Sequence, residues 1–148
     1  MAEPGHVPVL GAEVVRLLAP AGDCLIVDCT AGLGGHSAML LDAAGPAARL
    51  LAIDVDERNL TTAREHLARF GERVRFFVAN FAQTRLVLDE AGEGRADVLL
   101  ADLGVASTQL DDPARGLSFQ SPGPLDMRLD PSLRTTAADL VNTMEEGA

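Results

Sequence analysis

The 148-residue chain has no tryptophan and no tyrosine, so its five phenylalanines are its aromatic residues. Aliphatic side chains must therefore fill most of its interior. No apolar run approaches the roughly 18 residues that a membrane-spanning helix needs. Residues 1–10 also lack the basic region and the long apolar stretch of a signal peptide. We therefore expect a cytoplasmic protein with no membrane partner.

Basic residues are also scarce. The chain has 12 Lys and Arg against 22 Asp and Glu, which gives a formal net charge of -10. Broad binding to a nucleic-acid backbone depends on basic patches. The charge therefore argues against a free-standing, nonspecific nucleic-acid binder, although it leaves room for a local basic groove.

The two cysteines, Cys24 and Cys29, lie in or beside one predicted strand. Their odd offset places them on opposite faces, roughly 16 Å apart at the rise of a strand. That separation is too long for a disulfide, and no second Cys/His cluster accompanies them as in a metal site. We expect two buried thiols and no metal.

Short apolar segments alternate with helical patterns through the first hundred residues. The predicted strands cover residues 24–30, 49–56, 73–80 and 96–104. The predicted helices cover residues 9–20, 36–45, 57–71 and 81–92. This alternation is typical of right-handed βαβ units. It predicts an α/β fold with a parallel, doubly wound sheet.

The character of the chain changes from Val105 onward. Four prolines and several aspartates precede one more predicted helix at residues 135–146. An irregular stretch of this length is uncommon unless it is functional or disordered. We therefore divide the chain into an α/β domain at residues 1–104 and a substrate-side segment at residues 105–148.

A glycine cluster, "DCTAGLGGHS" at residues 28–37, follows the first predicted strand. Ligands of open α/β sheets bind beyond the carboxyl ends of the strands, and glycines allow positive φ and close backbone approach. From Gly32 the pattern is G-x-G-x-x-S, so Ser37 occupies the third position of the dinucleotide fingerprint. Asp54 follows Gly32 by 22 positions, where a carboxylate can bind a ribose diol. These features fit NAD, S-adenosylmethionine or a tight turn without a ligand.

Charge separates the two cofactors. A pyrophosphate is repelled by nearby carboxylates, whereas S-adenosylmethionine carries a sulfonium and an ammonium group. Asp28 and Asp102, which end the first and fourth predicted strands, would favour those cations. The pattern therefore favours S-adenosylmethionine over NAD, with loop or helix capping as the alternative role of Asp28.

Three further residues have two interpretations each. Phe81, just after the third predicted strand, could lie against an adenine ring or pack in the core. Arg115 and Arg128 could bind phosphates. Alternatively, these arginines order their own loop by pairing with nearby carboxylates, which are those of Asp111, Asp112, Asp126 and Asp130.

Seven segments, in this order, resemble the RsmH/MraW family: "HVPVL", "DCTAGLGGHS", "AIDVD", "NF", "DLGVAS", "RGLSF" and "GPLDMRLD". "RGLSF" followed by "GPLDMR" is the most specific part, and the resemblance covers nearly the whole chain. Members of this family are S-adenosylmethionine-dependent methyltransferases that act on the N4 amino group of a cytosine in small-subunit (16S) ribosomal RNA. The resemblance implies a Rossmann-like class I sheet in strand order 3-2-1-4, with small-subunit ribosomal RNA or the small ribosomal subunit as partner.

The resemblance also implies a set of residues in contact with S-adenosylmethionine. They are Gly34, Gly35, His36, Asp54, Phe81, Asp102 and Gln109. Asp102 is our candidate catalytic residue. The amino lone pair of cytosine is delocalised into the ring, so an acceptor for its N–H bonds would stabilise the positive charge that grows on nitrogen.

The chain departs from the family pattern in two ways. Ala106 and Thr108 stand where family members typically have Ser and Pro. Family members also extend well beyond this length, so we expect an incomplete sheet whose fourth strand is an exposed apolar edge. Three hypotheses follow: a ribosomal RNA (cytosine-N4) methyltransferase that is active or inactive in this short form, a non-catalytic cofactor-binding remnant, and an NAD-dependent oxidoreductase.

Overall fold

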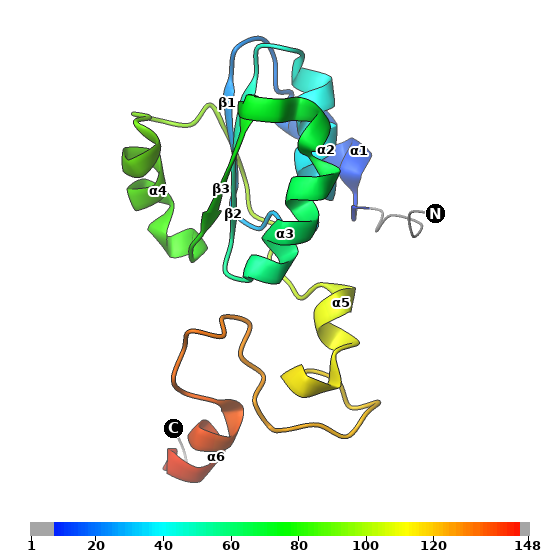
Figure 1. Ribbon diagram of the computed structural model, residues 1–148, viewed down its shortest axis with the longest axis vertical. Helices are drawn as coiled ribbons and strands as arrows, with labels where there is room; N and C mark the ends of the chain where they lie inside the picture. The colour runs from blue at the N-terminus through cyan, green and yellow to red at the C-terminus, as the bar shows by residue number, and fades with distance from the viewer. Residues whose placement is uncertain (1–7, 146–148) are drawn as a thin grey trace. The chain divides into compact units, whose positions relative to one another are not determined.

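The computed structural model describes residues 8–145 (Figure 1). The chain divides into two compact units, one that ends at Asp102 and one that begins at Leu103. Across the described residues, no helix is long and apolar enough to cross a membrane. In the same range, no three His, Cys, Asp or Glu side chains are grouped as metal ligands would be.

The first unit contains a four-stranded sheet in the order β3-β2-β1-β4 with every pair parallel. Its strands are β1 (Leu25–Asp28), β2 (Arg49–Asp54), β3 (Val74–Val78) and β4 (Val98–Leu100). All four residues of β1 are buried, as expected for a central strand that is covered on both faces. The predicted α/β class and strand order are confirmed.

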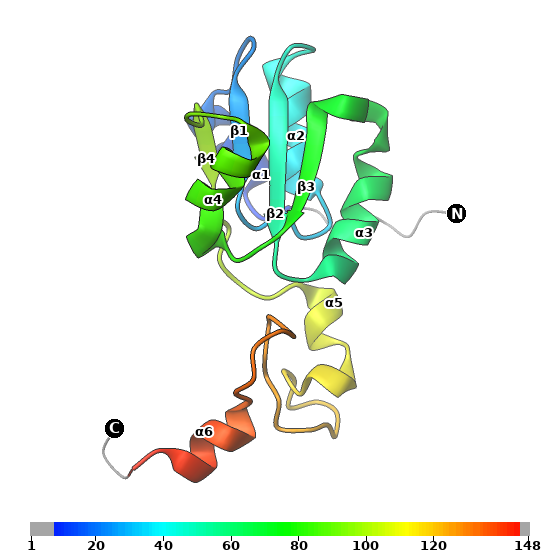
Figure 2. The same ribbon diagram turned by 60° about the vertical axis from the view of Figure 1, so that its left-hand side comes forward.

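Helices cover both faces of this sheet (Figures 1 and 2). The helices are α1 (Gly11–Leu18), α2 (Gly35–Ala44), α3 (Glu57–His66) and α4 (Thr84–Ala91). One apolar cluster packs the sheet against α1, α2 and α3, and a second packs its other face against α4. Cys24 belongs to the first cluster and Cys29 to the second. Both thiols are buried and free, as predicted.

Two predicted helices are divided in the structure, and each division has a local cause. The helix predicted at residues 57–71 ends at His66 and continues as the 3₁₀ helix η1 (Ala68–Arg73), in which Gly71 has a non-helical φ of 57°. The helix predicted at residues 81–92 begins as the 3₁₀ helix η2 (Phe81–Gln83) before α4. Asn80 starts η2, since its side chain accepts a hydrogen bond from the Ala82 amide.

The edge strand β4 is shorter than the predicted range of residues 96–104. It pairs with β1 on one side and ends the sheet. Val98 is buried, but Leu99 is 52% exposed. The strand therefore has the exposed apolar character that the sequence predicts for this edge.

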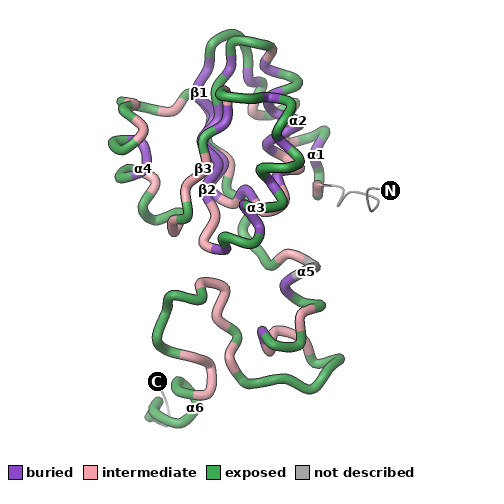
Figure 3. Tube along the Cα trace, viewed as in Figure 1, coloured by how far each residue is buried: buried purple, intermediate pink, exposed green. Residues whose placement is uncertain are grey.

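The second unit has little regular structure. It contains α5 (Ser107–Leu110), the 3₁₀ helix η3 (Pro113–Arg115) and α6 (Ala137–Thr143). The predicted helix at residues 135–146 corresponds to α6, although residue 146 lies outside the described range. Most of the unit is exposed or half-buried, whereas buried residues concentrate in the first unit (Figure 3).

Candidate functional site

The loops at the carboxyl ends of β1, β2 and β4 are joined by hydrogen bonds. The Asp102 amide donates to Thr30 Oγ1 at 2.8 Å, which ties the end of β4 to the glycine loop. The Gly32 amide donates to Asp54 Oδ2 at 2.8 Å, which ties the same loop to the end of β2. Three strand ends therefore form one polar rim.

The Asp54 carboxylate is held in a fixed orientation at this rim. Its Oδ1 accepts from the Asp56 amide at 2.8 Å, and Asn59 Nδ2 lies 3.4 Å from both oxygens. A carboxylate offers about four lone-pair sites, so these donors leave capacity for a further one. Asp54 is half-buried and can therefore accept from a hydroxyl-bearing ligand.

The backbone conformation and the close packing at position 34 both require a glycine. Gly34 caps α2 with a φ of 84°, in the left-handed region that favours glycine. A Cβ at this position would also lie 3.2 Å from the Leu67 side chain, where α2 and the end of α3 approach each other. Gly35 is the first residue of α2. The loop glycines thus position the helix start that carries His36.

His36 and Asp102 face each other across the rim. His36 Nε2 lies 2.9 Å from the Val9 carbonyl oxygen, and Nδ1 lies 3.7 Å from Asp102 Oδ2. A carbonyl can only accept, so His36 Nε2 donates this hydrogen bond to Val9. The imidazole is 10% exposed and the carboxylate 52% exposed. The exposed Asp102 carboxylate offers an acceptor to a ligand with N–H groups.

Asp28 ends the first strand, so its position in the sequence suggests that it lies at the rim, but the structure shows that it does not. It is fully buried, and its carboxylate accepts from Ser37 Oγ at 2.7 Å and from the Thr30 amide at 3.1 Å. Burial raises the pKa of Asp28, and these hydrogen bonds partly oppose the rise. The prediction that Asp28 attracts a cationic ligand is therefore wrong, and the loop-capping alternative is right. Ser37 replaces the glycine of the dinucleotide pattern because its hydroxyl holds this carboxylate.

Phe81 follows β3 and is 49% exposed, so core packing does not account for it. The Ala79 amide donates to the Asp54 carbonyl oxygen at 3.0 Å, which keeps the end of β3 beside the end of β2. The first unit thus places Phe81 at the same end of the sheet as Asp54, His36 and Asp102.

Gln109 belongs to the second unit. It is buried on α5, and its Oε1 accepts from the Ala106 amide at 2.9 Å. The structure therefore gives it a local role in shaping α5. Of the predicted site residues, it is the one that the first unit does not contain.

The two arginines of the second unit order their own loop. Arg128 binds the Asp126 carboxylate through Nε and Nη2, each at 2.7 Å. These hydrogen bonds lower the pKa of Asp126 to about 2. Arg115 is buried and donates to the Leu129 carbonyl oxygen at 3.3 Å. The structural alternative is therefore right for Arg128, and Arg115 also serves the loop.

Known proteins resemble this chain over nearly its full length. The MraW methylase family matches residues 3–148. Ribosomal RNA small subunit methyltransferase H from Sorangium cellulosum (strain So ce56) is 47% identical over 141 residues, which cover 95% of this chain and 44% of the relative. The protein of the same name from Geotalea daltonii is 47% identical over 146 residues, which cover 99% of this chain and 47% of the relative. The chain spans about half the length of these curated relatives.

Solved structures agree with this relationship at the level of the fold. The crystal structure of NSun6 from Pyrococcus horikoshii with SFG matches with a TM-score of 0.51 and 25% identity. The match covers 69% of this chain and 25% of that chain. The sheet order, the polar rim and the similarity of sequence lead to one conclusion: the chain belongs to the MraW methylase family.

Proposed function

We propose that this chain is the cofactor-binding part of an S-adenosylmethionine-dependent methyltransferase. Its substrate would be the N4 amino group of a cytosine in the 16S ribosomal RNA of the small subunit, in the cytoplasm. The observation that carries the proposal is the convergence of His36, Asp54 and Asp102 at one polar rim. Family membership supports it, as do the relatives named ribosomal RNA small subunit methyltransferase H.

The residues of the first unit fit such a cofactor. Asp54 would accept a hydrogen bond from a ribose hydroxyl, since its three present donors leave capacity for a further one. Phe81 would offer its half-exposed ring to the adenine. The first turn of α2 has no acidic residue, so the amide end of this helix at Gly34 and Gly35 suits the cofactor carboxylate.

The charge of the rim supports the choice between cofactors. Without Asp28, the carboxylates of Asp54 and Asp102 remain at the rim. The Asp102 carboxylate, beside His36, would hold the cofactor ammonium group, and a pyrophosphate would be repelled by the carboxylates of Asp54 and Asp102. Gln109 is a further proposed cofactor contact, which is supported by the family resemblance alone.

Methyl transfer needs an electrophilic methyl group, which S-adenosylmethionine supplies when bound. Asp102 is our proposed catalytic residue, because its exposed carboxylate can accept from the cytosine amino group. Such an acceptor would stabilise the positive charge that develops on the attacking nitrogen. The target base must also be unstacked to reach this rim.

Calorimetry on the full chain tests the cofactor. We expect S-adenosylmethionine and S-adenosylhomocysteine to bind and NAD not to bind. The substitution Asp102→Asn should weaken S-adenosylmethionine binding about tenfold, because it removes a charge-assisted contact. The matched control is Asp42→Asn, since Asp42 is also 52% exposed and pairs instead with Arg69 on the surface. Preferential binding of NAD would contradict the proposal.

A second assay separates the enzyme from a non-catalytic cofactor-binding protein. The full chain is incubated with labelled S-adenosylmethionine and small ribosomal subunits that lack the modification. Label in the ribosomal RNA that depends on Asp102 supports the methyltransferase. Cofactor binding without any label supports the non-catalytic alternative.

A further inference from the structure

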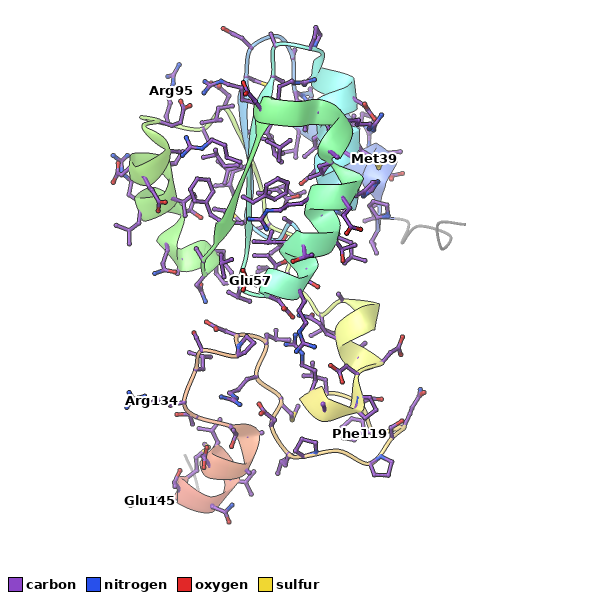
Figure 4. All side chains as sticks on the ribbon, in the orientation of Figure 1. Met39, Glu57, Arg95, Phe119, Arg134 and Glu145 are labelled. Atoms are coloured by element: carbon purple, nitrogen blue, oxygen red, sulfur yellow. The ribbon has the colours of Figure 1, made fainter. Side chains whose placement is uncertain are left out.

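The second unit carries an aromatic side chain that is entirely solvated. Phe119 is 106% exposed, on the loop between Gly116 and Gly123 (Figure 4). Full exposure leaves the ring without the stabilisation that burial of a phenylalanine provides. Single exposed apolar residues are common on protein surfaces, so a role for Phe119 depends on the loop that carries the ring.

The loop that carries Phe119 is closed at its base. A Cβ at Gly116 would overlap the Pro124 carbonyl oxygen, and one at Gly123 would overlap the Pro113 carbonyl oxygen. The two arms of the loop are therefore in direct backbone contact. The Met127 amide also donates to the Arg115 carbonyl oxygen at 3.0 Å. A ring presented on a closed loop loses less conformational freedom on binding than one on a free tail.

The neighbours of Phe119 are uncharged and can form hydrogen bonds. Ser118, Gln120 and Ser121 flank it, and residues 116–125 contain no acidic side chain in a chain of net charge -10. The Ser118 hydroxyl accepts from the Gln120 amide at 3.2 Å, which orders the tip. An aromatic face beside neutral polar groups suits an unpaired RNA base, which stacks through its face and forms hydrogen bonds through its edge.

We propose that Phe119 is a stacking platform for an unpaired base of the RNA substrate. Ser118 and Gln120, which are its neighbours in sequence, would form hydrogen bonds with the edge of that base. The inference rests on the proposed function for the identity of the ligand as RNA. Replacement of a stacking aromatic residue by alanine weakens RNA binding by about 5- to 150-fold.

The absence of tryptophan and tyrosine makes a direct measurement possible. In the full-length Phe119→Trp variant, the indole is the single strong fluorophore and keeps a stacking face. We expect its emission to be quenched by an RNA hairpin whose loop contains unpaired cytidines, and not by a fully paired RNA of the same length. The matched control is Val141→Trp on α6, whose position in the same unit is 71% exposed. Its emission should not respond to either RNA.

Affinity for the hairpin, measured by anisotropy of labelled RNA, gives the second readout. Phe119→Ala and Phe119→Leu should both bind about 5- to 150-fold more weakly, whereas Phe119→Trp should bind like the parent chain. Retained affinity in Phe119→Leu would overturn the proposal, since leucine is apolar but cannot stack.

Three other outcomes would also overturn it: equal quenching of Phe119→Trp by paired RNA, no quenching by either RNA, and an emission shift that grows with protein concentration alone. The last would assign Phe119 to an interface between copies of the chain. Calorimetry with S-adenosylmethionine on the same samples separates the two proposals. If the parent chain binds the cofactor but the emission of Phe119→Trp does not respond to RNA, the stacking proposal is wrong and the proposed cofactor site stands.

Discussion

The two units of this chain are stabilised in different ways. In the first, apolar clusters flank both faces of a parallel sheet. In the second, the buried residues within its described range are Gln109 and Arg115, and both are polar. Backbone contacts and hydrogen bonds, each worth about 0.5–1.5 kcal/mol net, must therefore order the second unit. We infer that the first unit, which holds the polar rim, is the more rigid, and that the second unit opens at a lower free energy.

The largest effect is expected where this difference is greatest, at the apolar core. Leu50 is fully buried in β2. Leu50→Ala should lower the free energy of unfolding by about 2–5 kcal/mol, because it leaves a cavity. Urea denaturation followed by circular dichroism measures the loss. The control is Leu99→Ala on β4, the edge strand of the same sheet, where a half-exposed side chain should matter by about 0.5 kcal/mol or less. Similar losses of unfolding free energy in the two variants would show that burial in the apolar core is not what stabilises the first unit.

An intermediate effect is expected in the second unit, at the glycine that closes the loop. Gly116 has a φ of 63°, and a side chain there would overlap the Pro124 carbonyl oxygen. The backbone strain alone costs about 1–3 kcal/mol in Gly116→Ala. Amide hydrogen exchange should show lost protection at Met127 and unchanged protection at Cys29, whose amide donates to Leu100 within the first unit.

Gly104→Ala is the matched control for this substitution. Gly104 lies in the same unit, and no atom lies within 4 Å of the position that its Cβ would occupy. Exchange at Met127 should therefore match that of the parent chain. A Gly116→Ala variant with the same protection would show that the close backbone approach does not order this unit.

The difference between an apolar core in the first unit and backbone contacts in the second also decides how much of the fold can be predicted from the sequence. Alternation of apolar and polar segments predicts the four strands, because a buried parallel sheet imposes a strong pattern, whereas their order is what the family resemblance implies. The ends of elements are less predictable, as at Gly71, where one backbone conformation divides a helix. In the second unit, order depends on contacts such as that of Gly116 with Pro124. Periodicity carries no information about such contacts.

The candidate site shows a similar limit. The rule that ligands bind at strand ends locates Asp54 and Asp102 at the rim. It fails for Asp28, because a position in the chain does not reveal that the carboxylate turns inward to Ser37. The contact between His36 and the Val9 carbonyl joins residues 27 positions apart. It depends on how the segment before α1 packs, which no local pattern encodes.

The smallest expected effect concerns two carboxylates with opposite surroundings, Asp28 in the first unit and Asp126 in the second. Desolvation raises the pKa of Asp28 above 3.8, whereas hydrogen bonds from Arg128 lower the pKa of Asp126 to about 2. Titration of the side-chain carboxyl carbons by nuclear magnetic resonance measures both values. Arg128→Gln should return the pKa of Asp126 toward 3.8 and leave that of Asp28 unchanged.

The two shifts have opposite signs in their effect on stability. The pKa of Asp126 is lowered, so this carboxyl binds fewer protons in the folded than in the unfolded chain. Its contribution to the free energy of unfolding is therefore complete above pH 3.8 and is lost as the pH falls through 2. Asp28 binds more protons in the folded chain, so its contribution falls as the pH rises above 3.8. Salt should weaken the effect at Asp126, whose ion pair is partly exposed, more than the effect at buried Asp28. A pKa of Asp28 at or below 3.8 would show that hydrogen bonds from Ser37 and Thr30 outweigh burial, and the contrast between the units would then not extend to their carboxylates.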